Sequence, residues 1–147
     1  MRGWEPWLPA VGAVVLLAVV IWAVRTKQGR RGPRRGDIWW AEVPFADGSG
    51  AKIRPCLVLL RHRRGLVVLK ITSSDKSHRR DHLRIPTRGW DPRARKDSYL
   101  DVGRPIMVRA GSFQRRAGAC DPAVLREIRG RTGLRPRELS VFARQAS

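Results

Sequence analysis

The sequence is short of acidic residues. Its 147 residues include 12 Asp and Glu against 31 Lys and Arg, which gives a formal net charge of +19. Residues 36–147 keep 24 of these cations and 11 of these acids, a net charge of +13. A charge of this size on a small domain indicates a polyanionic partner, which is a nucleic acid, a membrane surface or an acidic protein.

Cysteine and histidine are also scarce. The two cysteines, Cys56 and Cys120, do not have the spacing of zinc ligands, and in a cytoplasmic domain they are expected to be reduced thiols rather than a disulfide. His78 and His82 lie in the segment "DKSHRRDHLR" with two aspartates, but the arginines of this segment repel a divalent cation. We therefore predict no metal site and no other cofactor.

Two catalytic signatures are missing. No glycine-rich phosphate loop precedes a helix, and no nucleophile elbow is present. Nucleotide-driven chemistry and serine hydrolysis are therefore poorly supported.

One long apolar run is present near the start of the sequence. Residues 7–24, "WLPAVGAVVLLAVVIWAV", contain no charged residue. A helix of this length spans about 27 Å, close to the ~30 Å thickness of a bilayer's hydrocarbon core. Trp7 and Trp22 lie near its ends, where indole rings prefer the membrane interface. We predict a transmembrane anchor within residues 1–24; the alternatives are a cleaved signal peptide and a buried core helix.

A basic linker follows the apolar run. Residues 25–35 contain six Lys and Arg residues and no acid. Positive residues stay on the cytoplasmic side, so we expect a single-pass protein of the cell membrane, with its N-terminus outside and residues 36–147 in the cytoplasm. The six cations can also lie against anionic lipid, each contributing roughly 1 kcal/mol near the surface.

Residues 36–147 are predicted to form a mainly β domain with a C-terminal helix. Short segments rich in branched and aromatic residues occur at 36–43, 55–60, 65–71, 82–86 and within 98–109, with loop-forming residues between them. The segments 55–60 and 65–71 are joined by "RHRRG" and are expected to pair as a hairpin. Short strands at this spacing favour a small, strongly bent sheet or barrel.

One helix is clear in the sequence. Asp121 is a good N-cap, Pro122 follows it at the first helical position, and Gly133 can end the helix. The pattern also allows a second short helical segment at 135–145.

The candidate functional residues lie at the ends of the two strands of the predicted hairpin. Arg54 precedes the first strand, and Thr72, Ser73 and Ser74 follow the second. The start of one strand of a hairpin lies beside the end of the other, so these residues are expected to meet at one edge of the sheet. A guanidinium beside hydroxyls and backbone N–H groups is suited to binding phosphate.

Pro55 supports this interpretation, because it holds the preceding residue extended and directs Arg54 outward. The alternative is that Arg54 pairs with Asp37 or Asp101 and that the hydroxyls only cap a turn.

The same segments resemble the MazF/PemK/Kid family of toxin–antitoxin ribonucleases. The blocks that carry the resemblance are "RGDIWW", "RPCLVL", "ITSS" and "VRAGSF", in this order over roughly residues 35–132. The resemblance implies an SH3-like small β-barrel with a C-terminal helix, usually a homodimer. It also implies cleavage of single-stranded RNA without a metal, and inhibition by a small antitoxin protein.

The resemblance also implies roles for individual residues. Arg54 matches the arginine of the family's "RP" motif, with an acid/base or phosphate-stabilising role. Thr72 matches the threonine that positions the scissile phosphate, and Ser73 would assist. Further contacts to nucleic acid are expected from the basic residues Lys52, Arg79, Arg80 and Arg109, the last of which matches a second arginine that some members use near the phosphate.

Two positions depart from the family pattern. The loop "ADGSGAK" lacks the Glu or His that members commonly carry before the "RP" motif, and Gly111 stands where an Asp often follows the second arginine. Both usual proton acceptors are therefore missing, and a positioned general base is typically worth ~10²–10⁴-fold in rate. Asp47, His78 and His82 are the candidate substitutes; without one, activity is weak or absent.

Three hypotheses follow from the sequence. The first is a membrane-anchored endoribonuclease acting through Arg54 and Thr72. The second is a catalytically degenerate barrel that holds RNA, DNA or a partner protein at the membrane. The third is a structural protein whose charge contacts only lipid, but lipid binding would not require Arg54 and Thr72 to be placed together.

Overall fold

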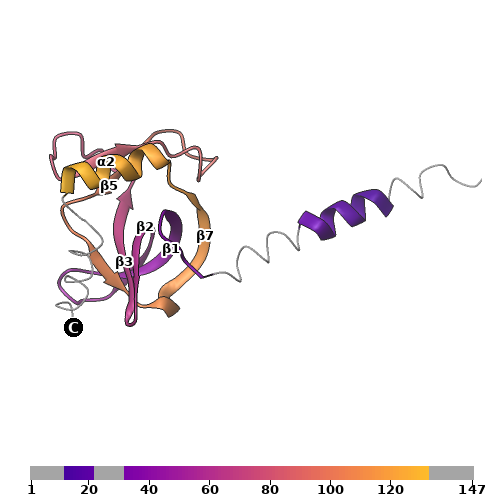
Figure 1. Cartoon of the computed structure of the whole chain (residues 1–147), viewed down its shortest axis with the longest axis horizontal. Helices are drawn as coiled ribbons and strands as arrows, with labels where there is room; N and C mark the ends of the chain where they lie inside the picture. The colour runs from indigo at the N-terminus through magenta and orange to yellow at the C-terminus, as the bar shows by residue number, and fades with distance from the viewer. Residues whose placement is uncertain (1–11, 22–31, 133–147) are drawn as a thin grey trace, which may run out of the picture. The chain divides into compact units, whose positions relative to one another are not determined.

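The computed structural model describes residues 12–21 and 32–132. The chain divides into two units, Met1–Gly32 and Pro33–Ser147. In the first unit, residues 12–21 form a helix (Figure 1). Of the described residues, none belongs to a helix long and apolar enough to cross a membrane. Much of the predicted anchor (1–24) and of the predicted linker (25–35) lies outside the described residues, and the helical segment predicted at 135–145 lies entirely outside them.

The second unit is an antiparallel sheet followed by a helix. Its elements are β1 (Asp37–Pro44), β2 (Ala51–His62), β3 (Gly65–Thr72), β4 (His82–Ile85), β5 (Ser98–Asp101), β6 (Ile106–Val108), the 3₁₀ turn η1 (Ala110–Ser112), β7 (Phe113–Ala119) and α2 (Pro122–Thr132). The strand order is β4-β5-β3-β2-β1-β7, and β6 also pairs with β3. The predicted mainly β fold with a C-terminal helix is confirmed.

The sheet is strongly curved, and its strands surround the core (Figure 1). The register between β2 and β3 shifts between Val58 and Leu60, and the register between β1 and β7 shifts twice. Irregularities of this kind bend a strand and increase its twist. Curvature buries both faces of the central strands: Leu57 and Leu69 belong to one core cluster, while Val58 and Val68 belong to another.

Helix α2 lies across one end of the curved sheet (Figure 1). It starts as predicted, because Asp121 Oδ1 accepts a hydrogen bond of 2.7 Å from the backbone N–H of Ala123. Val124 and Ile128 are buried and pack in the same core cluster as Ile38 of β1.

Strand β2 begins earlier than the sequence predicted. It starts at Ala51 rather than at Pro55, so Arg54 lies inside the strand rather than before it. Pairing with β1 extends over this whole segment, whereas pairing with β3 extends only as far as Cys56↔Lys70. The segment before Cys56 is therefore unpaired on its β3 side, where a proline is tolerated.

Candidate functional site

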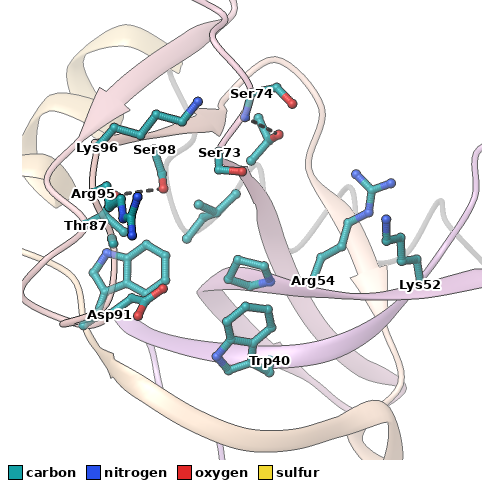
Figure 2. Close-up of a pocket in the computed structure, with 15 residues that line it drawn as sticks. Trp40, Lys52, Arg54, Ser73, Ser74, Thr87, Asp91, Arg95, Lys96 and Ser98 are labelled. Atoms are coloured by element: carbon teal, nitrogen blue, oxygen red, sulfur yellow. Dashed lines mark hydrogen bonds between the residues drawn. The ribbon is translucent and has the colours of Figure 1, made fainter.

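A pocket of about 760 Å³ opens where β2 and β3 separate (Figure 2). Beyond the Cys56↔Lys70 pair, β3 pairs with β5 through Ile71↔Leu100 and Thr72↔Tyr99. The pocket is lined by Trp40, Lys52, Arg54, Pro55, Ile71, Thr72, Ser73, Ser74, Thr87, Trp90, Asp91, Ala94, Arg95, Lys96 and Ser98. Four of these residues are cationic and one is acidic, so the pocket favours an anion.

Arg54, Thr72, Ser73 and Ser74, which the sequence placed at one edge of the sheet, all line this pocket. Lys52, two residues before Arg54 on the same strand, lines it as well. Figure 2 shows the side chains of Arg54 and Lys52 next to each other. The structure therefore gathers two cations and three hydroxyls, as a phosphate site requires.

Arg54 does not form the ion pairs that the alternative interpretation proposed. The carboxylate of Asp37 accepts hydrogen bonds of 3.0 and 2.9 Å from Arg116, and Asp101 pairs with Lys70 at 3.7 Å. Within residues 32–132, Arg54 forms no salt bridge. Its half-buried guanidinium is therefore available to a ligand.

The alternative also proposed that the hydroxyls cap a turn, and this is correct for Thr72. Thr72 Oγ1 accepts a hydrogen bond of 3.2 Å from the backbone N–H of Ser74, so the hydroxyl does close a turn. This bond uses an oxygen lone pair and leaves the hydroxyl proton free to be donated to a bound anion.

The other predicted nucleic-acid contacts are not in the pocket. Arg79 donates hydrogen bonds of 2.8 and 2.6 Å to Asp81, which neutralises much of its charge, and Arg80 is exposed in the same loop. Arg109 follows β6, which pairs with the Gly65 end of β3, whereas Thr72 lies at the opposite end of that strand. The implied location of Arg109 near the same phosphate therefore does not fit this chain.

None of the three proposed substitute bases lines the pocket. Asp47 lies in the loop between β1 and β2, and hydrogen bonds from the hydroxyl and backbone N–H of Ser49 lower its pKa, which weakens it as a base. His82 is almost fully buried and its Nδ1 lies 2.8 Å from Asp81 Oδ1. His78 is exposed in the loop between β3 and β4.

The histidine loop does bring metal-ligand atoms together. One ligand atom each from Asp81, His82 and Asp101 lies within 4.8 Å of the others. Arg79 and Lys70 pair with the two carboxylates, however, and Arg79 holds the pKa of Asp81 well below its usual range. These cations already balance the negative charge that a divalent ion would need.

Sequence reasoning missed the second wall of the pocket, which comes from the loop between β4 and β5. This loop contributes Trp90, Asp91, Arg95 and Lys96. It is fixed by a 3.0 Å hydrogen bond from Trp90 Nε1 to the backbone oxygen of Pro86. The combination of an aromatic residue, an acid and three cations in "WDPRARK" was a usable signal, but only the fold brings it opposite Arg54.

A third wall comes from β1 through Trp40. Trp40 pairs with Pro55 across the β1–β2 ladder, and the guanidinium carbon of Arg115 lies 5.0 Å from the centre of its ring. A cation at this distance is attracted to the ring face and restrains the indole.

Comparison with known proteins gives a family match over most of the second unit. Residues 34–132 match the family described as PemK-like, MazF-like toxin of type II toxin–antitoxin system. No curated protein matches the chain. Among solved structures, one similar chain is an endoribonuclease in complex with its cognate antitoxin from Mycobacterial species. It is 17% identical, with a TM-score of 0.48, over 68% of this chain and 88% of that chain.

Proposed function

Because the chain belongs to the PemK-like, MazF-like toxins of type II toxin–antitoxin systems, we propose that it is a metal-independent endoribonuclease of single-stranded RNA. The observation that carries the proposal is the shared pocket of Arg54, Thr72 and Ser73. The scissile phosphate would bind at this end of the pocket.

The chemistry needs a proton acceptor, a proton donor and positive charge at the phosphate. The 2′-hydroxyl loses its proton to the acceptor and its oxygen attacks the adjacent phosphorus; the bond from phosphorus to the 5′-oxygen breaks, and the 5′-oxygen takes up a proton, which leaves a cyclic phosphate and a free 5′-hydroxyl. Arg54 offers two parallel N–H donors to the phosphoryl oxygens, on which negative charge grows in the transition state. Lys52 adds a second positive charge, while the hydroxyls of Thr72 and Ser73 hold the phosphate in place.

A second candidate function is supported by the lack of a base near these residues. Asp47, His78 and His82 all lie outside the pocket, so no predicted proton acceptor reaches the phosphate. A pocket that keeps its phosphate ligands but lacks these three bases is suited to holding RNA or an acidic protein without cutting it. A weak nuclease is intermediate between these two functions, since the loss of a general base lowers the cleavage rate ~10²–10⁴-fold.

The proposal includes three further points. Residues 7–24 would anchor the protein in the cell membrane, with the N-terminus outside and the pocket in the cytoplasm, because six cations follow that run. A small antitoxin protein would inhibit the toxin, as in other members of the family. The domain would close into an SH3-like barrel and act as a homodimer.

The test is RNA cleavage by the purified chain in the presence of EDTA. We expect cleavage of single-stranded RNA, with a cyclic phosphate at the new 3′ end. Arg54→Ala and Thr72→Ala should each lower the rate at least tenfold. Arg54→Lys should recover only part of it, because an ammonium group cannot form the paired N–H contacts.

A matched control is Arg80→Ala, which removes an exposed cation outside the pocket and should leave the rate within about twofold. Tight RNA binding without cleavage of any sequence would establish the binding function instead. Cleavage by Arg54→Ala at the rate of Arg80→Ala and of the wild type would contradict the catalytic role of Arg54.

A further inference from the structure

The pocket has two ends that differ in chemistry. Figure 2 shows Arg54 and Lys52 on one side, and Thr87, Asp91, Arg95, Lys96 and Ser98 on the other. The first end is the phosphate site described above. The second end carries the one acidic side chain among the residues that line the pocket, and no residue of β2 lies there.

The volume exceeds what one phosphate group needs. The pocket encloses about 760 Å³. A phosphate group has five heavy atoms and displaces only a few water molecules, at about 30 Å³ each. The remaining space is bounded by two indole rings, Trp40 and Trp90, and by the loop between β4 and β5. Bases of single-stranded RNA are commonly bound against aromatic side chains of this kind.

Asp91 is rigidly held and still has acceptor capacity. Its backbone N–H donates to the carbonyl of Thr87 at 2.8 Å, and its Oδ1 accepts from the backbone N–H of Arg93 at 3.2 Å. Within residues 32–132 no salt bridge involves Asp91, so Oδ2 and one lone pair of Oδ1 are free. Behind it, the hydroxyls of Thr87 and Ser98 are bonded to each other at 2.8 Å and buried, which stiffens this wall.

We propose that the end of the pocket containing Asp91 is a nucleobase subsite that selects guanine. This inference rests on the proposed function, because it places the base next to the phosphate bound by Arg54. A carboxylate only accepts hydrogen bonds. The Watson–Crick edge of guanine presents two adjacent donors, N1–H and the N2 amino group, and so matches both carboxylate oxygens. Adenine and cytosine place an acceptor beside their amino group, and uracil places carbonyls on both sides of its single N–H.

Asp91 is less suited to act as the missing general base than to recognise a nucleobase. A base must reach the 2′-hydroxyl beside the scissile phosphate, within about 3 Å or through one water molecule. Figure 2 shows Asp91 across the pocket from Arg54, with Ser73 and Trp40 between them in the view. We therefore assign the Asp91 carboxylate to the base rather than to the 2′-hydroxyl beside the phosphate. Arg95 and Lys96, which line the pocket as well, are available for a neighbouring phosphate.

The experiment compares the full-length chain with Asp91→Asn and with Asp97→Asn. Asp97 lies in the same loop, pairs with exposed Arg84 and does not line the pocket, so its variant controls for the loss of one negative charge. Cleavage of a random single-stranded RNA pool is sequenced at the cut sites. We expect wild type and Asp97→Asn to prefer guanine at one position beside the cut, and Asp91→Asn to lose roughly 10- to 100-fold of that preference.

A second measurement does not depend on cleavage. Binding of 3′-GMP, 3′-AMP, 3′-CMP and 3′-UMP is followed by quenching of tryptophan fluorescence. Tighter binding of 3′-GMP that Asp91→Asn abolishes supports the subsite, even if the protein cuts no RNA. Cleavage that is the same at all four bases in the wild type, or a guanine preference that survives in a folded Asp91→Asn variant, overturns the subsite and leaves the nuclease function standing.

Discussion

Arg54 is available to a ligand because of its neighbours in β2. Pro55 follows it and Lys70 ends the ladder on the β3 side, so the guanidinium lies where two strands part. Asp37 and Asp101, the two partners that the sequence suggested, are occupied by Arg116 and Lys70. In a protein with 31 Lys and Arg residues, one cation is not by itself evidence of a binding site. This one is informative because its potential partners are taken and a pocket lies beside it.

Cys56 lies two residues from Arg54 and yet is predicted to be unreactive. Burial raises the pKa of its thiol to about 12, and the nearby charges of Lys70 and Arg54 only reduce this effect. Burial likewise raises the pKa of Cys120 to about 11. Since a raised thiol pKa leaves the neutral form dominant up to that pH, both thiols should resist alkylation at pH 8.

Mass spectrometry after treatment with iodoacetamide checks this. Neither cysteine should be modified in the native protein, and both should be modified in guanidinium chloride. Rapid modification of Cys56 without denaturant would show that the core cluster around Cys56 opens to solvent.

At the scale of elements, helix α2 depends on its first turn. Asp121 is the N-cap, and Asp121→Ala removes the bond to the N–H of Ala123. We expect the free energy of unfolding to fall by about 1 kcal/mol. Glu127→Ala is the matched control, because it removes an exposed pair with Arg131 that is worth only about 0.3–0.5 kcal/mol. Urea denaturation measures the free energy of unfolding of both variants. An equal decrease in the two would mean that the N-cap contributes no more to stability than the exposed ion pair.

Strand β7 and the loop between β4 and β5 meet at Gly118. A Cβ atom added there would lie 2.7 Å from the Cβ of Trp90, one wall of the pocket. Gly118→Ala should therefore displace Trp90 and cost about 1–3 kcal/mol of stability. Gly111→Ala is the control, because a Cβ atom there meets nothing within 4 Å among the described residues. Thermal unfolding measures the loss of stability, and the tryptophan emission spectrum reports the displacement of Trp90. Unchanged emission in Gly118→Ala would contradict the displacement.

For the whole molecule, the excess of cations predicts steep salt dependence of RNA binding. Each phosphate contact to a single strand contributes about −0.7 to the slope of log affinity against log salt. If the four cations of the pocket each contact a phosphate, the slope is about −3. Binding of a labelled oligonucleotide between 50 and 300 mM salt measures it. A slope near zero would mean that the charge of the pocket is not used for RNA.

The anchor is also tested on the whole chain. With reporters fused to either end, we expect cytoplasmic signal from the C-terminal fusion and external signal from the N-terminal one. Removal of residues 1–24 should release the protein from the membrane fraction. Cytoplasmic signal from both fusions would overturn the orientation, and no change on removal would overturn the anchor.

Much of the fold could be predicted from local sequence. Alternating and continuous apolar residues located the strands except β7 (Phe113–Ala119), which has few apolar residues, and the Asp121–Pro122 pair located the start of α2, because periodicity and capping depend on near neighbours. The start of β2 was misplaced by several residues. Glycines and charges at 46–54 are typical of a loop, yet β1 supplies hydrogen bonds that extend the strand to Ala51.

The sequence by itself determined that Arg54 and Thr72 line one pocket, since a hairpin places the start of one strand near the end of the next. Only the tertiary structure decided what faces them. The loop at 86–97 is far from Arg54 along the chain, and it becomes a wall of the same pocket because β5 pairs with β3 at Thr72. Pairing between distant strands depends on burial and sheet curvature summed over the whole domain, which no short segment contains.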